Sequence, residues 1–161
     1  MTLVVADTTP LSCLLRIGRT DILRTLFPDI RVPTAVADEL DRGGAIVGDW
    51  RPSLLSFARI EPLEPSPLLT VLLDELDAGE AAALALATQL RADLVLLDEL
   101  RGRAVAARLG VPALGTLGLV VLAKKRGVIV AARPLIAQVR AEGGLWVTDK
   151  LVAEVLARIG E

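Results

Sequence analysis

Two aspartates stand where short apolar runs end, and their placement suggests chemistry. Asp7 follows Leu3–Ala6, and Asp98 follows Leu94–Leu97. In open parallel sheets, ligands bind beyond the carboxyl ends of the strands. Two carboxylates held close together there resist joint ionisation unless a cation neutralises them. Mg²⁺ and Mn²⁺ prefer oxygen ligands, and such ions can activate water for phosphodiester hydrolysis. The pattern therefore predicts a divalent metal site.

The residue types available narrow the chemistry further. The chain has no histidine, which excludes Ser-His-Asp and Cys-His catalysis and zinc sites that contain histidine. Its only cysteine, Cys13, lies in the apolar stretch Leu11–Leu15, so it cannot form an internal disulfide and is interpreted as core. A single cysteine fits a reducing cytoplasm. Any catalysis must therefore come from carboxylates, hydroxyls, Arg or Lys.

Each candidate acid also has a structural interpretation. Asp7 has the position of a helix cap, and Asp98 that of a turn residue. Glu80 stands three residues after Asp77, which is the spacing of a capping box. Glu39 fits a solvated helix face. Taken one at a time, these acids leave both interpretations open.

Composition bounds the class of protein. The 161 residues suit one domain, 1–161, with a single core. Although 53% of the residues are hydrophobic, the longest uncharged run, Leu109–Ala123, is broken by glycines and a proline and is too short to span a bilayer. The first six residues have no signal-peptide pattern. A net charge of −2 and 2% aromatic residues give no compositional mark of nucleic-acid binding.

Strand-like runs alternate with helical patterns along the chain. This alternation predicts a three-layer α/β/α fold with a short, mostly parallel central sheet. The expected strands are 2–6, 30–32, 58–60, 94–97 and an edge strand at 111–114. Helices are expected after Asp7 and Pro33, over 21–27, from Pro67 to Leu76, across the alanine-rich segment before Ala92, and over 101–109, 117–126, 134–142 and 148–159.

The sequence Leu-Leu-Asp-Glu-Leu occurs twice, and its flanks separate the two copies. Leu72–Leu76 follows a proline-started apolar stretch, so it is predicted to end a helix. Leu96–Leu100 follows a brief hydrophobic run after a long alanine-rich segment, so it is predicted to be a strand and a turn. Only the second copy puts its aspartate, Asp98, at a strand end.

Taken in order, these motifs resemble a known family. The chain resembles the PIN-domain nucleases, within a compact bacterial and archaeal branch akin to VapC-type toxins. The resemblance covers nearly the whole chain. The matching stretches are Val4–Leu11, Val32–Leu40, Leu76–Ala83, Leu97–Arg103 and Gly115–Gly118, together with the closing helices.

The resemblance implies an Mg²⁺- or Mn²⁺-dependent endoribonuclease that hydrolyses RNA phosphodiester bonds. The implied catalytic and metal-binding acids are Asp7, Glu39, Glu80 and Asp98. The hydroxyl of Thr9 would lie beside the first acid. The branch often has paired aspartates where this chain has Asp98-Glu99, so the role of Glu99 is open. Arg103 would contact substrate phosphate or pair with Glu99.

Partners and competing functions complete the sequence-based hypothesis. The resemblance implies a small antitoxin protein and a homodimer, in addition to RNA. Arg101, Arg103, Arg108 and Lys124–Arg126 would form a positive rim around the acids or act as solubilising charges. One alternative is a PIN-like binding module without catalysis. The other is a phosphoaspartyl phosphatase, although such enzymes need a second aspartate where this chain has Thr9.

Overall fold

The computed structural model describes residues 2–161 and contains one five-stranded sheet. The order across the sheet is β3-β2-β1-β4-β5, and every neighbouring pair is parallel. The strands are β1 Leu3–Ala6, β2 Asp29–Pro33, β3 Ala58–Glu61, β4 Leu94–Leu96 and β5 Ala113–Leu114. The predicted three-layer fold, with β5 at an edge, is therefore confirmed.

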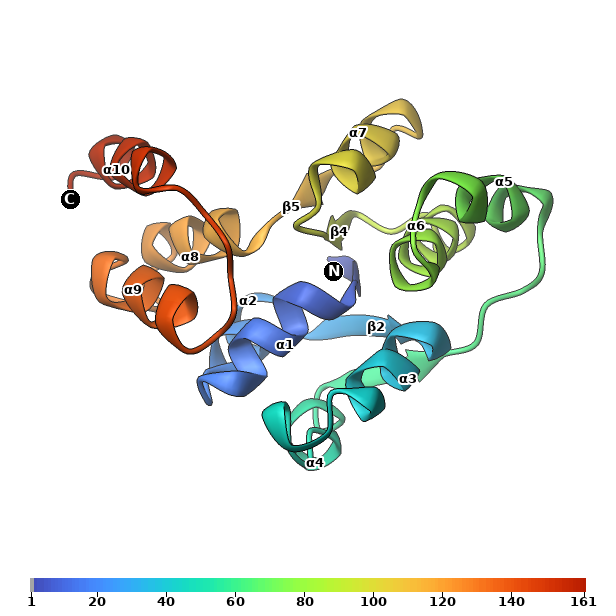
Figure 1. Cartoon of the computed structure of the whole chain (residues 1–161), viewed down its shortest axis with the longest axis horizontal. Coiled ribbons are helices and arrows are strands. Elements are labelled where there is room, and N and C mark those ends of the chain that lie inside the picture. Colours follow the sequence, from blue (N-terminus) through green and yellow to red (C-terminus); the bar gives the residue numbers. More distant parts are fainter. Residues whose placement is uncertain (1) are drawn as a thin grey trace.

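Helices cover the sheet and connect its strands (Figure 1). They are α1 Thr8–Arg16, α2 Thr20–Leu26, α3 Thr34–Arg42, α4 Arg51–Leu54, α5 Pro67–Glu75, α6 Ala78–Leu90, α7 Leu100–Arg108, α8 Thr116–Lys125, α9 Arg133–Ala141 and α10 Asp149–Arg158, with a 3₁₀ turn at Gly44–Ile46. The α4 helix and the 3₁₀ turn are not predicted by the sequence patterns. No helix within residues 2–161 is long and apolar enough to cross a membrane.

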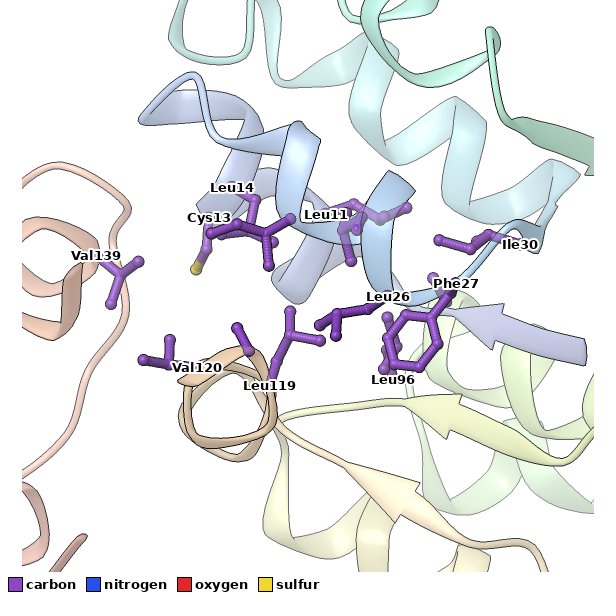
Figure 2. Packing of buried hydrophobic residues seen from close by; sticks show 14 of the residues in the cluster. Leu11, Cys13, Leu14, Leu26, Phe27, Ile30, Leu96, Leu119, Val120 and Val139 are labelled. Atoms are coloured by element: carbon purple, nitrogen blue, oxygen red, sulfur yellow. The ribbon is translucent and has the colours of Figure 1, made fainter. Parts of the chain in front are cut away.

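Alternate side chains of each strand face opposite layers. Val4 belongs to a core formed with α1, α2, α8 and α9, whereas its neighbour Val5 packs into a second core with α5, α6 and α7. Figure 2 shows the first core, in which Leu14, Leu119 and Val139 come from three different helices. A sheet buried on both faces explains why its strands are apolar runs without polar alternation.

The strand order reverses beside the central strand. From β1 the chain proceeds through β2 and β3 to one edge, and β4 then pairs with the opposite side of β1. Such a reversal leaves a crevice at the carboxyl ends of the two central strands, where open α/β proteins bind ligands. Asp7 and Asp98 follow β1 and β4, so both lie at this end of the sheet.

Candidate active site

Asp7 is held at the end of β1 by the neighbouring strand, and its carboxylate is not used by the helix that follows. Its backbone N–H donates to the carbonyl of Leu96 over 2.9 Å. Although Asp7 has the N-cap position of α1, its side chain makes no capping hydrogen bond. Asp7 is 4% exposed, and its Oδ1 is the buried side-chain polar atom without a hydrogen-bond partner in residues 2–161. An unpartnered buried carboxylate oxygen is costly, so something else is expected to bind it.

Burial and negative neighbours make the charge of Asp7 unfavourable. Desolvation, together with the charges of Asp77, Glu39 and Glu80, raises the pKa of Asp7 to about 7 against the opposing effect of the Thr8 backbone amide. A carboxyl group with such a pKa remains half protonated near neutral pH unless a cation neutralises it.

Glu39 approaches Asp7 from α3 across the start of α6. The Thr8 hydroxyl donates to Glu39 Oε2 over 2.6 Å and thereby fixes this carboxylate. A Cβ atom added at Gly79 would lie 2.5 Å from Glu39 Oε1 and 3.0 Å from Asp7 Oδ1. Glycine at position 79 therefore leaves room for two carboxylate oxygens that converge on one point.

Glu80 lies one residue further along α6, among the same acids. Asp77 caps this helix, because its Oδ1 accepts a 2.8 Å hydrogen bond from the Glu80 backbone N–H. The half of the predicted capping box in which Asp77 accepts from Glu80 is confirmed, yet residue Glu80 is only 7% exposed. Burial raises the pKa of Glu80 well above its usual value, and the charges of Asp77 and Glu99 act in the same direction. Capping and membership of the acidic cluster are thus compatible.

Asp98 is bound differently, because both of its oxygens have partners. Its Oδ1 accepts from the Thr116 backbone N–H over 2.7 Å, and its Oδ2 accepts from the Thr116 hydroxyl over 2.6 Å. Thr116 is fully buried at the start of α8. This bidentate contact orients Asp98 rigidly. The nearby Cys13 thiol is buried in the core, and desolvation, aided by the charge of Asp98, raises its pKa to about 11.

Three further predicted residues surround Asp98. A Cβ atom at Gly115 would lie 2.9 Å from Asp98 Oδ1 and 3.1 Å from Arg103 Nη1, so the guanidinium reaches toward this carboxylate. Arg103 makes no side-chain ion pair with Glu99 in the described part of the chain, which removes that alternative. Glu99 is exposed. Thr9 lines a groove with Asp98, Glu99 and Arg103.

Sequence patterns missed three contributors to this geometry. Thr8, rather than Thr9, provides the hydroxyl that binds Glu39. Thr116 orients Asp98 across 18 positions of sequence. Asp77 adds a negative charge that acts on both Asp7 and Glu80. A signal existed only for Asp77, through its capping-box spacing, because the two threonine contacts depend on how distant elements pack.

The residues present fit a divalent cation in their chemistry. An orphaned oxygen of Asp7, a convergent oxygen of Glu39 and the glycine that makes room for both form an oxygen-only donor set suited to Mg²⁺ or Mn²⁺. Within residues 2–161, no group of three or more acidic or cysteine side chains is already arranged closely enough to hold an ion. Asp7 and Glu39 would therefore be the first carboxylates to hold such an ion, since Mg²⁺ is usually bound through one or two carboxylates and keeps several waters.

The fold and the site define an open, parallel α/β protein with a carboxylate cluster at its topological switch point. A family model described as a PIN domain matches residues 3–161. The chain therefore belongs to the PIN-domain family, in which nuclease activity supported by divalent metal ions is typical. A search of curated proteins finds no match.

Proposed function

We propose that this protein is a metal-dependent endoribonuclease that hydrolyses RNA phosphodiester bonds with Mg²⁺ or Mn²⁺. The observation that carries the proposal is the buried Oδ1 of Asp7, which has no partner in the described residues and converges with Glu39 over Gly79. A purely structural carboxylate would be hydrogen-bonded or exposed. An oxygen left unpaired in an acidic crevice is instead typical of a cation ligand.

The acids have distinct roles in this proposal. The proposed metal-binding and catalytic residues are Asp7, Glu39, Glu80 and Asp98. A bound ion supplies the positive charge that activates water and offsets charge on the phosphate. The Thr8 hydroxyl keeps Glu39 turned toward Asp7, and Thr116 holds Asp98 in one orientation.

The groups beside the acids bind the substrate. Arg103, whose guanidinium reaches over Gly115 toward Asp98, contacts a phosphate of the RNA. Thr9, which lines the same groove, helps to position that nucleotide, and Glu99 adjusts the charge around Glu80.

The biological setting follows from the resemblance to VapC-type proteins. We propose a toxin that acts on cytoplasmic RNA, is restrained by a small antitoxin protein and forms a homodimer. Size-exclusion chromatography with light scattering measures the dimer. Growth arrest on expression, relieved by Asp7→Asn, tests the toxin role.

The decisive experiment combines metal titration with RNA cleavage. The protein is dialysed against EDTA, and Mn²⁺ binding is followed calorimetrically for the wild type and for Asp7→Asn. Labelled RNA is then incubated with each protein, with and without Mn²⁺ or Mg²⁺. The proposal expects binding and endonucleolytic cleavage in the wild type and loss of both in the variant.

The same experiment separates the alternatives. Metal-independent RNA binding without cleavage under any metal condition would favour the inactive binding module. Release of phosphate from a small phosphoester, with an acyl-phosphate trapped on Asp7, would favour the phosphoaspartyl phosphatase. Cleavage that persists after confirmed metal removal would overturn the proposed mechanism.

A further inference from the structure

A groove leads away from the acidic site between α7, α8 and α10. Its first hollow, of about 530 Å³, begins at Thr9, Asp98 and Glu99 and extends to Trp146 and Leu151. A second hollow of about 520 Å³ continues along α8 and α10. The two share the residues Arg103, Gly115, Leu117, Gly118 and Leu151, so they form one continuous depression, here named the α10 groove. Each hollow has the size of an ordinary ligand site.

Trp146 stands beside this groove almost completely in solvent. It is 94% exposed, whereas the other tryptophan, Trp50, is 3% exposed. A tryptophan side chain can bury about 150–250 Å² of surface, so the chain gives up a large hydrophobic stabilisation by leaving Trp146 in water. Exposed large apolar side chains that border a groove mark binding surfaces.

The exposure of Trp146 does not come from a loose connection. On one side Leu145 is buried, and its N–H donates to the Val139 carbonyl over 3.1 Å. On the other side the Val147 carbonyl accepts a 3.1 Å hydrogen bond from Arg140, and α10 begins immediately afterwards. In Figure 1 the segment between α9 and α10 runs past α8. The backbone thus holds the indole outward in a defined place.

The charges of the α10 groove suit a polyanion. Arg103, Lys125 and Arg158 line it, all three are exposed, and none takes part in an ion pair within residues 2–161. Some other surface cations have partners, as Arg108 has Glu75, and others such as Arg101 and Lys150 have none within residues 2–161, so what sets the three apart is that they line one groove. Unpaired cations next to an exposed indole are the elements that single-stranded nucleic acids use, with phosphates on the cations and bases on the aromatic face.

We propose that the α10 groove is a binding subsite for a single-stranded segment of the RNA substrate, with an unpaired base stacked on Trp146. Arg103, Lys125 and Arg158 contact phosphates on the way from the acidic site. This subsite rests on the proposed nuclease function, since the groove opens at Asp98 and Glu99. A duplex does not fit the proposal, because its bases are stacked on one another and present no free face.

The test measures RNA binding in EDTA, where metal-dependent cleavage is silent. The probes are a ten-nucleotide oligoadenylate, an abasic strand of the same length and a duplex RNA. The variants are Trp146→Ala, Trp146→Phe and, as a matched control, Val130→Ala, which removes an apolar side chain that is 96% exposed and lies outside the groove. Tryptophan emission adds a direct signal of binding at Trp146. A bound base can contact this exposed ring, whereas the second tryptophan, Trp50, is buried.

The expected results follow from stacking and charge. Oligoadenylate should quench the emission of Trp146, and Trp146→Ala should weaken its binding about ten- to hundredfold. Trp146→Phe should restore most of the affinity, and Val130→Ala should change nothing. The abasic strand should bind the wild type as weakly as oligoadenylate binds Trp146→Ala. Lys125→Ala or Arg158→Ala should each reduce the slope of log affinity against log salt by roughly 0.7.

Two outcomes would overturn the subsite. Oligoadenylate binding that is unchanged in Trp146→Ala would assign the exposed indole to another partner, such as a docked protein. Equal affinity for the abasic strand would exclude base stacking. Failure of the nuclease proposal can be distinguished from failure of the subsite. RNA binding that depends on Trp146, without cleavage in any metal, would refute catalysis and still support the subsite.

Discussion

Replacing Asp7 with asparagine should stabilise the metal-free protein, and the stabilisation should depend on pH. Burial and the surrounding acids raise the pKa of Asp7 from 3.8 to about 7. The folded state therefore binds a proton more tightly than the unfolded state does, and the wild type loses stability as the pH rises through this interval. Asparagine keeps the shape of the side chain but never ionises, so Asp7→Asn avoids this loss.

The expected magnitude follows from the shift. Each pKa unit corresponds to about 1.4 kcal/mol, so the gain of Asp7→Asn should reach at most about 4 kcal/mol above pH 7. It should decline by about 1.4 kcal/mol per pH unit below 7 and vanish near pH 4. Urea unfolding in EDTA at several pH values measures this difference. Asp74→Asn removes a charge from the exposed surface of α5 and should stay within about 0.5 kcal/mol of the wild type throughout.

Metal should narrow the difference in stability between the wild type and Asp7→Asn. Mn²⁺ at a hundred times its dissociation constant stabilises a folded protein by about 2.7 kcal/mol, and only the wild type has the ligand for it. Two results would refute the reasoning: no stabilisation of Asp7→Asn at pH 8 in EDTA, or a stabilisation of equal size at pH 4 and pH 8. Either would mean that Asp7 is not an unfavourably buried charge.

Three further predictions test the supports of the site. Gly79→Ala should lower metal affinity and cleavage tenfold or more, because the added Cβ would intrude on Glu39 Oε1 and Asp7 Oδ1. The substitution should leave α6 folded. Calorimetry measures the metal affinity, and circular dichroism checks the helix content. Thr116→Val should cost about 1–3 kcal/mol in urea unfolding and reduce cleavage, because it removes a hydrogen bond from Asp98 and alters a fully buried site. Cleavage should fall as the pH drops below about 7, where protons compete for Asp7, and added Mn²⁺ should shift the profile toward acid at a lower concentration than Mg²⁺. A profile insensitive to metal concentration would contradict that competition.

The elements of the fold were predictable because the hydrophobic periodicity and the residues that typically begin or end helices and strands agree over most of the chain. The apolar run Leu3–Ala6 stops at Asp7 and the structure has β1 there, and the repeated Leu-Leu-Asp-Glu-Leu was resolved correctly by its flanks. The segment between α3 and β3 was not predicted. Its short α4 helix has only four residues, and its position depends on Trp50, which is buried and donates to Asp41.

The candidate site was less predictable, because its geometry depends on contacts between distant elements. Spacing indicates Asp7 and Asp98 as strand-end acids, yet it cannot show that Asp98 is bound at both oxygens while Asp7 has an oxygen without a partner. Spacing likewise indicates that Asp77 caps a helix, but not that Glu80 is buried. The Thr8 to Glu39 hydrogen bond requires α1 and α3 to pack together, which no local pattern specifies.

Arrangement, rather than composition, decides how an acidic protein can accept an anionic substrate. Judged by composition alone, a net charge of −2 and few aromatic residues argue against nucleic-acid binding. The acids of the cluster gather around Asp7, whereas unpaired cations such as Lys125 and Arg158 follow the groove that leaves Asp98. The exposed ring of Trp146 beside the groove offers a stacking face, whereas the buried rings of Trp50 and Phe27 do not. In the proposed function, the negative cluster would attract the cation and the cations of the α10 groove would attract the RNA strand. Arg103, whose guanidinium reaches toward Asp98, stands where the two regions meet.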